Sequence, residues 1–224
     1  MEHVLLEIDG LQIEAKPGES VLEAALNHSI FIPHLCHEEG HQEPFGGCRL
    51  CFVEIQGKAT PVTSCTQPVK PGMIVRTNTD TVRRLQRSAL RLILSNHRVD
   101  CVGCFAHKRC RLQELARALG VGLKVSGLKD LSLQESIDSS LGKVLYDRSK
   151  CVLCGKCVSW ARTNKTGVFQ FVGRGLATRI GLFPFEGDQE ILEGSWDVCP
   201  VGALFPADAA KVKQAPSSDS PHDP

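Results

Sequence analysis

The 11 cysteines of this 224-residue chain fall into three separate blocks, and this grouping constrains the fold more than any other feature of the sequence. The first block is C-x11-C-x2-C-x13-C, the second is C-x2-C-x5-C, and the third is C-x2-C-x2-C with one distant cysteine. An odd number of cysteines argues against a framework of disulfides, and the close C-x2-C spacing favours metal ligation over simple burial. Blocks of four, three and four account for every cysteine in the chain.

The third block is the most specific of the three. Cys151, Cys154 and Cys157 are followed at a distance by Cys199-Pro200. In bacterial ferredoxins with two clusters, such a triplet binds a [4Fe–4S] cluster together with a remote Cys-Pro. That pattern would place further cysteines at four positions, which hold Ala161, Gln189, Leu192 and Ser195. The sequence therefore predicts one complete [4Fe–4S] site and the loss of a second one.

The region around the first block is predicted to form a small mixed sheet with one crossing helix. Residues 4–15 alternate as a hairpin around Asp9-Gly10, a dipeptide typical of two-residue turns. Ser20 and Glu23 form a capping box at the start of a helix. Residues 51–57 and 73–79 are typical of further strands.

The first block has the four thiolates that a [2Fe–2S] cluster requires, in Cys36, Cys48, Cys51 and Cys65. The small residues Gly46 and Gly47 would let backbone amides approach the bridging sulfides. The alternative ligands nearby are His34, His37 and His41. Because four cysteines are available, these histidines are interpreted as polar loop residues.

The middle block has only three cysteines, Cys101, Cys104 and Cys110, and the residues alone leave either His97 or His107 as a fourth ligand. An amphipathic helix is predicted over 80–96, with arginines at 83, 87 and 91 opposite an apolar face of Val82, Leu85, Ala89, Leu92 and Ile93. A shorter helix is predicted over 111–119, ended by Gly120, and residues 121–146 are interpreted as a connector. Structural zinc remains the alternative for all three blocks, although zinc ribbons normally pair one C-x2-C with another.

Charge and the missing motifs limit the function classes. A net charge of +1 and the lack of aromatic residues among the arginines at 83, 84, 87 and 91 argue against nucleic acid, so this face is interpreted as solvated or as a contact for an acidic partner subunit. "GRGLAT" (173–178) and "GVGLKV" (120–125) lack the third glycine of a dinucleotide fingerprint, and we find no Walker loop and no nucleophile with a base. We therefore expect no catalytic site in this chain. NAD, flavin and substrate chemistry would reside on another polypeptide.

The sequence also contains no uninterrupted apolar stretch of about 18 residues, and its opening residues, MEHVLLEIDG, contain no secretory leader. We expect a cytoplasmic location with no direct membrane insertion, where any attachment to a membrane occurs through partner subunits.

The order of these motifs resembles the N-terminal part of the large iron–sulfur subunit of respiratory complex I, and equally the short diaphorase iron–sulfur subunit of NAD-reducing hydrogenases. NAD-linked formate dehydrogenases share the same module. The resemblance covers about residues 1–208 and includes "VGRG" at 172–175. It implies an α+β chain with a β-grasp [2Fe–2S] ferredoxin-like domain (1–79), a helical [4Fe–4S] segment and connector (80–146), and a degenerate bacterial-ferredoxin-like [4Fe–4S] domain (147–208). Residues 209–224, rich in Ser, Pro and Asp, are predicted to be a disordered tail.

The resemblance also selects a fourth ligand for the middle block. The family's ligand histidine precedes the middle cysteines, and the matching position here is His97. The implied set is His97, Cys101, Cys104 and Cys110, which makes one [2Fe–2S] and two [4Fe–4S] clusters in total. The arm "FAHKR" (105–109) departs from the acidic or neutral arm of many members, and its positive charge should raise the reduction potential of the cluster.

The function implied is that of an electron-transfer subunit of a multi-subunit NAD(P)-linked oxidoreductase. Such a subunit relays single electrons between a flavin- and NAD-binding diaphorase subunit and a hydrogenase, formate dehydrogenase or similar terminal redox subunit, in a hetero-oligomer. The alternatives are a truncated complex I-type subunit that serves quinone reduction, a separate multi-cluster ferredoxin, and a zinc-stapled interaction scaffold without redox activity.

Overall fold

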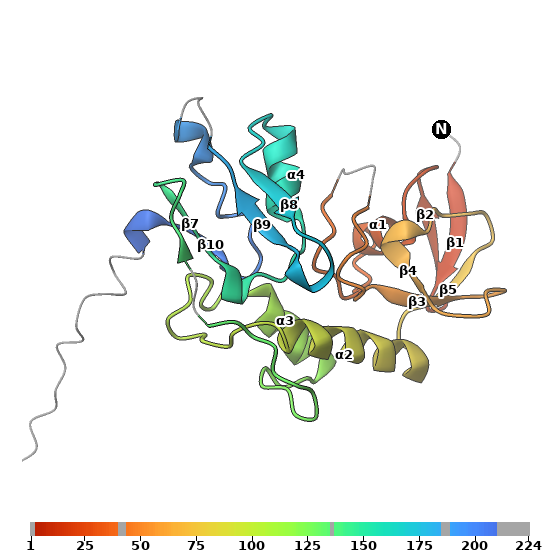
Figure 1. Cartoon of the computed structure of the whole chain (residues 1–224). Coiled ribbons are helices and arrows are strands. Elements are labelled where there is room, and N and C mark those ends of the chain that lie inside the picture. The colour runs from red at the N-terminus through yellow and green to blue at the C-terminus, as the bar shows by residue number, and fades with distance from the viewer. Residues whose placement is uncertain (1–2, 40–43, 135–136, 185–188, 210–224) are drawn as a thin grey trace, which may run out of the picture.

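The structure is a computed structural model that describes residues 3–39, 44–134, 137–184 and 189–209. Figure 1 shows the N-terminal sheet and the C-terminal strands side by side, with helices α2 (Asp80–Leu94) and α3 (Arg111–Leu119) along one side of both. The predicted disordered tail lies outside the described residues apart from Ala209, and so does His41.

The N-terminal hairpin is confirmed. Strands β1 (Val4–Ile8) and β2 (Leu11–Ala15) pair antiparallel through the turn at Asp9 and Gly10. These two residues have φ angles of 50° and 88°, which the short side chain of Asp and the missing side chain of Gly permit.

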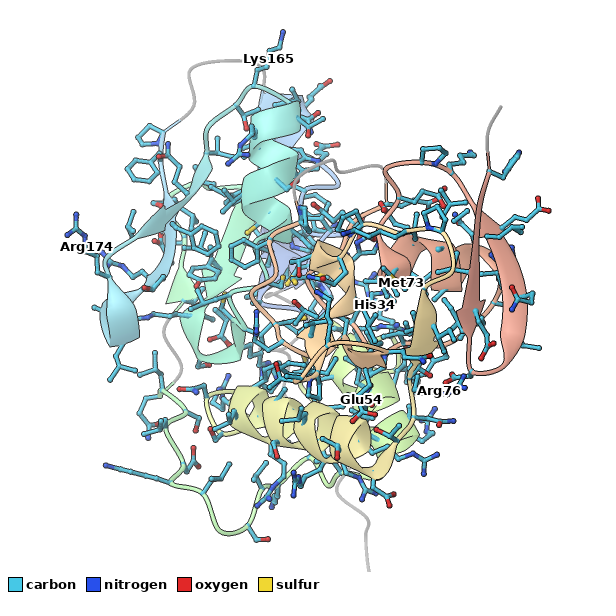
Figure 2. All side chains as sticks on the ribbon, turned by 90° about the vertical axis from the view of Figure 1, so that its right-hand side faces the viewer. His34, Glu54, Met73, Arg76, Lys165 and Arg174 are labelled. Carbon is cyan, nitrogen blue, oxygen red and sulfur yellow. The ribbon has the colours of Figure 1, made fainter. Side chains whose placement is uncertain are left out.

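The predicted mixed sheet with one crossing helix is also confirmed. Its five strands have the order β2-β1-β5-β3-β4, in which β1 and β5 are parallel and the other neighbours are antiparallel. The capping box of Ser20 and Glu23 starts helix α1, which buries four of its seven residues against the sheet. On the exposed face, Arg76 pairs with Glu7 at 2.8 Å and lies opposite Glu54 (Figure 2). The further elements of this unit are α1 (Val21–Asn27), β3 (Phe52–Ile55), β4 (Val62–Thr63) and β5 (Ile74–Arg76).

Helix α2 (Asp80–Leu94) forms as predicted, but the apolar face assigned from the sequence is partly wrong. Leu92 is 58% exposed, whereas Leu90 and Leu94 are buried together with Val82 and Ala89. The helix turns this second stripe inward because it packs against β3 and α3 at the same time. Gln86 is buried in the same stripe, and its amide donates to the backbone carbonyl oxygen of Phe52 at 3.0 Å.

Helix α3 (Arg111–Leu119) ends at Gly120 in the left-handed conformation, as predicted. Two arginines of α2 bind the end of α3 and the connector that follows it. Arg87 donates to the carbonyl of Leu119 at 2.6 Å, and Arg91 donates to the carbonyl of Ser126 at 2.7 Å. The connector region ends in strands β6 (Ile137–Asp138) and β7 (Val144–Asp147), and all four residues of β7 are buried.

The C-terminal unit surrounds the third cysteine block. Strand β7 lies between β6 and β10 in a three-stranded sheet, and β8 pairs with β9 as a separate hairpin. Helix α4 begins just after Gly155, inside the cysteine triplet. The remaining elements are α4 (Lys156–Thr163), β8 (Phe169–Val172), β9 (Arg179–Leu182) and β10 (Leu204–Pro206).

Two hydrophobic cores support these units. One lies under the N-terminal sheet, and the other is shared by α2, α3 and the C-terminal unit. Leu35 and Leu50, from the loop of the first cysteine block, belong to the second core, so this loop is anchored on both units. Across the described part of the chain, no helix is both long and apolar enough to cross a membrane.

Candidate metal centres

The four cysteines of the first block converge as two pairs of sulfur atoms. Cys36 is hydrogen-bonded to Cys48, and Cys65 is hydrogen-bonded to Cys51. In each pair one thiol keeps its proton and the other accepts, which lowers the pKa of both Cys48 and Cys51 to about 7. Two sulfur pairs are what two irons with two thiolates each require.

Most of these sulfurs are buried from solvent. Cys36, Cys51 and Cys65 are 6%, 1% and 4% exposed, and Cys48 is partly covered by the second core. Of the alternative ligands, His34 and His37 form a T-shaped ring contact with their centres 5.8 Å apart, and the ring of His34 is hydrogen-bonded through Nδ1 to the carbonyl of Ile32. Burial lowers the pKa of His34. The sulfur pairs therefore form without these histidines.

The third block lines one small cavity. Cys151, Cys154, Cys157 and Cys199 all face it, which brings the remote Cys-Pro to the triplet as predicted. Backbone N–H groups already point at two of the sulfurs: Leu153 donates to Cys151 at 3.4 Å, and Ala203 donates to Cys199 at 3.2 Å. Burial raises the pKa of Cys151 to about 11 and that of Cys154 and Cys157 further. A thiolate in this cavity needs a counter-charge, and iron provides one.

Positions at which a second cluster would have its cysteines are filled by core residues. Ala161 and Leu192 are buried in the shared core, and Ser195 is fully buried. The side chain of Gln189 lies outside the described residues. This packing supports the interpretation that only one cluster site is retained in the C-terminal unit.

The three cysteines of the middle block lie between α2 and α3. The Cys110 sulfur faces the first backbone N–H groups of α3, those of Leu112 and Gln113, and it is close enough to Cys101 and Cys104 to interact electrostatically with both. Burial raises the pKa of Cys110, as expected for a sulfur in an apolar environment.

His97 and His107 differ sharply in environment. His97 is 8% exposed and its Nδ1 lies 2.9 Å from the carbonyl oxygen of Lys150, while burial lowers the pKa of the imidazole. A neutral ring that donates through Nδ1 has its Nε2 lone pair available for a metal. His107 is exposed on the arm between Cys104 and Cys110. Asp147 and Arg98 also interact electrostatically with the His97 ring. The place of His97 in the middle ligand set remains a prediction.

The positively charged arm has a structural partner. Arg109 lies 4.3 Å above the ring of Phe105 and pairs with Asp197 of the C-terminal unit at 3.6 Å. Lys108 has a φ angle of 66° and is exposed beside it. The arm therefore contributes to the contact between the middle block and the C-terminal unit, and part of its charge is balanced there.

The C-terminal unit contacts both of the other blocks. Arg98 donates its backbone N–H to Ser149 at 2.9 Å, next to the bond from His97 to Lys150, so residues 97–98 run beside the start of the triplet. Phe45, from the loop of the first block, stacks on Phe171 at 5.4 Å, and both rings flank Gly155 within the triplet.

Two residues at these contacts, Lys150 and Phe45, were not predicted from the sequence. Lys150 is 2% exposed directly before Cys151, and its amine lies 4.0 Å from Asp100. Neither residue belongs to a spacing pattern in the sequence. The role of each depends on a partner distant in the sequence, Asp100 for Lys150 and Phe171 for Phe45.

Among the described residues, no three His, Cys, Asp or Glu side chains are gathered as closely as a single metal ion would require. A cluster sets a different condition, because its ligands are distributed over two or four irons.

Comparisons with known proteins match three separate segments of the chain to iron–sulfur families. Residues 1–80 match the family described as the 2Fe-2S iron-sulfur cluster binding domain, residues 86–123 the NADH-ubiquinone oxidoreductase-G iron-sulfur binding region, and residues 144–205 the 4Fe-4S single cluster domain. A chain in the crystal structure of an NAD+-reducing [NiFe]-hydrogenase in the H2-reduced state superposes with a TM-score of 0.79 at 33% identity, over 91% of this chain and 87% of that one. This chain belongs to the same family of iron–sulfur subunits. The family also includes iron–sulfur subunits of NADH-quinone oxidoreductases.

Two curated relatives illustrate that membership. A subunit of the NADH-quinone oxidoreductase of Rickettsia typhi is 31% identical over 90% of this chain, and the NADH-ubiquinone oxidoreductase 75 kDa subunit of Reclinomonas americana is 34% identical over 88% of it. The chain spans 30% and 28% of the length of these relatives. The predicted resemblance is thus confirmed, and the chain contains a 2Fe-2S domain together with 4Fe-4S binding regions.

Proposed function

We propose that this chain is the electron-transfer iron–sulfur subunit of a multi-subunit NAD(P)-linked oxidoreductase. The observation that carries the proposal is the convergence of the first and third cysteine blocks, each into one ligand set, together with the interaction of Cys110 with Cys101 and Cys104 in the middle block. The buried sulfurs and their N–H donors suit clusters that change charge by one electron without admitting water.

We infer the following ligands. Cys36, Cys48, Cys51 and Cys65 would hold one [2Fe–2S] cluster, and two [4Fe–4S] clusters would be held by His97, Cys101, Cys104 and Cys110 and by Cys151, Cys154, Cys157 and Cys199. When bound, the clusters supply one-electron redox chemistry. The polypeptide would exclude solvent from them and donate backbone hydrogen bonds to ligand sulfurs such as those of Cys151 and Cys199.

We interpret the mixed sheet with α1 as a β-grasp [2Fe–2S] domain over residues 1–79. The middle segment covers 80–146 and the C-terminal [4Fe–4S] domain covers 147–208. Strand β7, which starts at Val144, belongs structurally with the C-terminal domain.

The contacts between units supply short links between the three ligand sets. The bond from the His97 ring to the Lys150 carbonyl leads directly into Cys151, and the Phe45–Phe171 stack joins the first loop to the triplet. In this arrangement the third set has contacts with both of the others, although it comes last in the sequence.

We propose that the partners are a flavin- and NAD-binding diaphorase subunit and a terminal redox subunit, in a hetero-oligomer. A hydrogenase or formate dehydrogenase is favoured as the terminal subunit, because the similarity extends over 87% of a chain from a hydrogenase. A complex I-type NADH:quinone oxidoreductase is the second candidate, supported by the relatives of greater length. We expect a cytoplasmic protein that reaches a membrane only through such partners.

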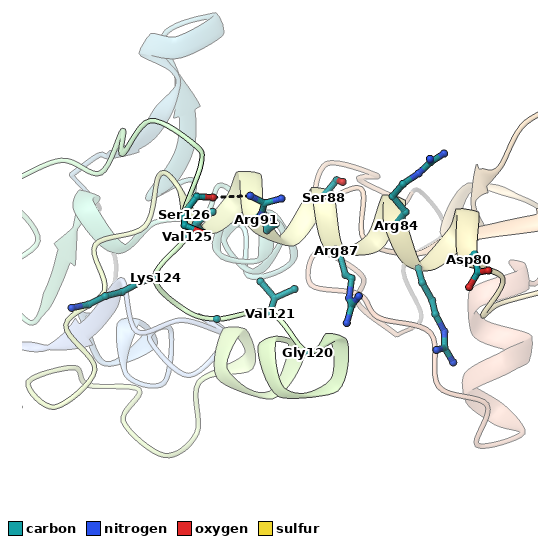
Figure 3. A pocket seen from close by; sticks show the side chains of 12 residues that line it. Asp80, Arg84, Arg87, Ser88, Arg91, Gly120, Val121, Lys124, Val125 and Ser126 are labelled. Atoms are coloured by element: carbon teal, nitrogen blue, oxygen red, sulfur yellow. Dashed lines mark hydrogen bonds between the residues drawn. The ribbon is translucent and has the colours of Figure 1, made fainter.

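The arginine face of α2 is the proposed contact for an acidic partner. Figure 3 shows Arg84, Arg87 and Arg91 along the helix beside a cavity of about 560 Å³. Arg87 and Arg91 donate hydrogen bonds to the carbonyls of Leu119 and Ser126. Arg83 and Arg84 would therefore provide the charge for docking.

Reversal of both Arg83 and Arg84 (Arg83→Glu with Arg84→Glu) should weaken co-purification with the partner subunits. The control is Lys165→Glu with Arg174→Glu, on the far side of the C-terminal unit (Figure 2). Equal co-purification of both variants would refute this docking surface.

Metal analysis of the purified chain tests the central proposal. The relay requires about ten iron atoms per chain, acid-labile sulfide and a brown colour. A zinc-stapled scaffold would instead contain about three zinc atoms and no visible absorbance. Zinc without sulfide would overturn the proposed function.

A further inference from the structure

Among the described residues, the buried side-chain oxygens that lack a hydrogen-bond partner are three hydroxyls, on Ser64, Tyr146 and Ser195. A buried hydroxyl without a partner is unfavourable, so each one indicates a group that the protein atoms alone do not supply. Two of these hydroxyls lie against cysteines of the proposed ligand sets.

Tyr146 lies on β7 and faces the third set. Its side chain is 3% exposed and lines the same cavity as Cys151, Cys154, Cys157 and Cys199. The phenol is close enough to the Cys151 sulfur to interact with it. Because the phenol oxygen has no hydrogen-bond partner among the described residues, its O–H is available as a donor. Tyr146 is also the only tyrosine in the chain.

Ser64 has the corresponding position beside the first set. It is fully buried, it precedes the ligand Cys65, and its backbone N–H donates to the carbonyl of Cys51 at 2.9 Å. Its hydroxyl interacts with the Cys51 sulfur and has no other hydrogen-bond partner among the described residues.

We propose that Tyr146 and Ser64 are positioning residues whose O–H groups donate hydrogen bonds to cluster sulfurs, Tyr146 at the third set and Ser64 at the first. An O–H dipole that points at a sulfur stabilises the extra negative charge of the reduced cluster more than the charge of the oxidised one. Each hydroxyl thus makes the reduction potential of its own cluster more positive. The inference rests on the proposed function, since it requires clusters in these two sets.

The spatial separation of the two hydroxyls gives a crossed test. In the full chain with its clusters, Tyr146→Phe should shift the midpoint potential of the third cluster to a more negative value and leave the first unchanged. Ser64→Ala should shift the midpoint potential of the first cluster to a more negative value and leave the third unchanged. Ser195→Ala is the matched control, because Ser195 is an equally buried hydroxyl without a partner and is not among the residues that line the cavity of the third set. Potentials are measured by redox titration followed by electron paramagnetic resonance, which resolves the clusters separately.

A second measurement keeps the test independent of folding in the variants. Because Tyr146 is the only tyrosine, growth on 3-fluorotyrosine changes this one phenol in the isolated chain. Fluorination makes the phenol a stronger donor, so the potential of the third cluster should shift opposite to that in Tyr146→Phe.

The outcomes distinguish a failure of the hydrogen-bond inference from a failure of the proposed function. Clusters that are present at unchanged potentials, or a shift in Ser195→Ala equal to that in Tyr146→Phe, would overturn the hydrogen-bond inference alone. A wild-type chain with zinc and no sulfide would overturn the proposed function and this inference with it.

Discussion

The Nδ1 atom of His97 lies 2.9 Å from the carbonyl oxygen of Lys150, the residue directly before Cys151. This bond orients the imidazole with its Nδ1–H toward the carbonyl, and burial, which lowers the pKa of the ring, favours the neutral form with a lone pair on Nε2. The bond also joins two cysteine blocks that are separated by 40 residues between Cys110 and Cys151. The orientation of the histidine is thus determined by the backbone that leads into the triplet.

Replacement of His97 should remove one cluster. His97→Ala should lower the iron content from about ten to about six atoms per chain, because a [4Fe–4S] site with three ligands is poorly retained. His107→Ala is the control at the exposed alternative and should keep the full content. Iron analysis and the paramagnetic spectrum of the middle cluster are the measurements. A normal spectrum in His97→Ala with an altered one in His107→Ala would reverse the assignment.

Gly202 should be sensitive to substitution for a reason that involves the middle set. A β-carbon there would lie 2.7 Å from the Ala106 nitrogen and 3.1 Å from the Cys104 sulfur, and the φ angle is 70°. Gly202→Ala should therefore displace Cys104 and reduce cluster content in addition to its backbone strain. Gly194→Ala is matched in strain, since its φ angle is 83°, but meets no atom within 4 Å. It should cost about 1–2 kcal/mol and retain the iron. Equal iron loss in both variants would show that strain alone is responsible.

The elements with strong local signals could be predicted from the sequence. The turn at Asp9-Gly10, the capping box at Ser20 and the end of α3 at Gly120 are each determined by residues within a few positions of one another. The convergence of Cys199 on the triplet was also predicted, because ligand spacing encodes a contact over a long distance.

Other features depend on what lies across from a residue, and the sequence does not carry that information. Periodicity placed Leu92 inside, but α2 packs on two elements at once and buries Leu90 and Leu94 instead. No local pattern in the sequence indicates that Arg87 and Arg91 donate to the carbonyls of Leu119 and Ser126. The burial of Lys150 is likewise not indicated by its sequence neighbours. The buried hydroxyls of Ser64 and Tyr146 become noticeable only when their lack of partners is known.

The bond between Arg87 and the carbonyl of Leu119 should stabilise the packing of the end of α3 against α2. Arg87→Ala removes a donor at 2.6 Å and should lower the free energy of unfolding by about 1 kcal/mol. Arg84→Ala, an exposed arginine on the same helix, should change it by less than about 0.5 kcal/mol. Chemical denaturation followed by circular dichroism compares them. Equal midpoints would mean that solvent satisfies the Leu119 carbonyl as well as the arginine does.

The stack of Phe45 on Phe171 should couple the loop of the first set to the C-terminal unit. The rings are 5.4 Å apart with an angle of 8° between them, and an offset stack of this kind contributes about 0.5–1.5 kcal/mol. A double-mutant cycle isolates the pair: Phe45→Ala and Phe171→Ala should be less destabilising together than the sum of the two single variants.

Phe31 supplies the matched cycle. It is 51% exposed, as Phe45 is, and it stacks on no aromatic ring of the residues that the structure describes. Phe31→Ala combined with Phe171→Ala should be additive within about 0.5 kcal/mol. A coupling of the same size in both cycles would indicate a general loosening of the fold. A coupling confined to Phe45 means that these two rings bind the first loop to the triplet, and the same variant should then make the segment around residue 45 more accessible to proteases.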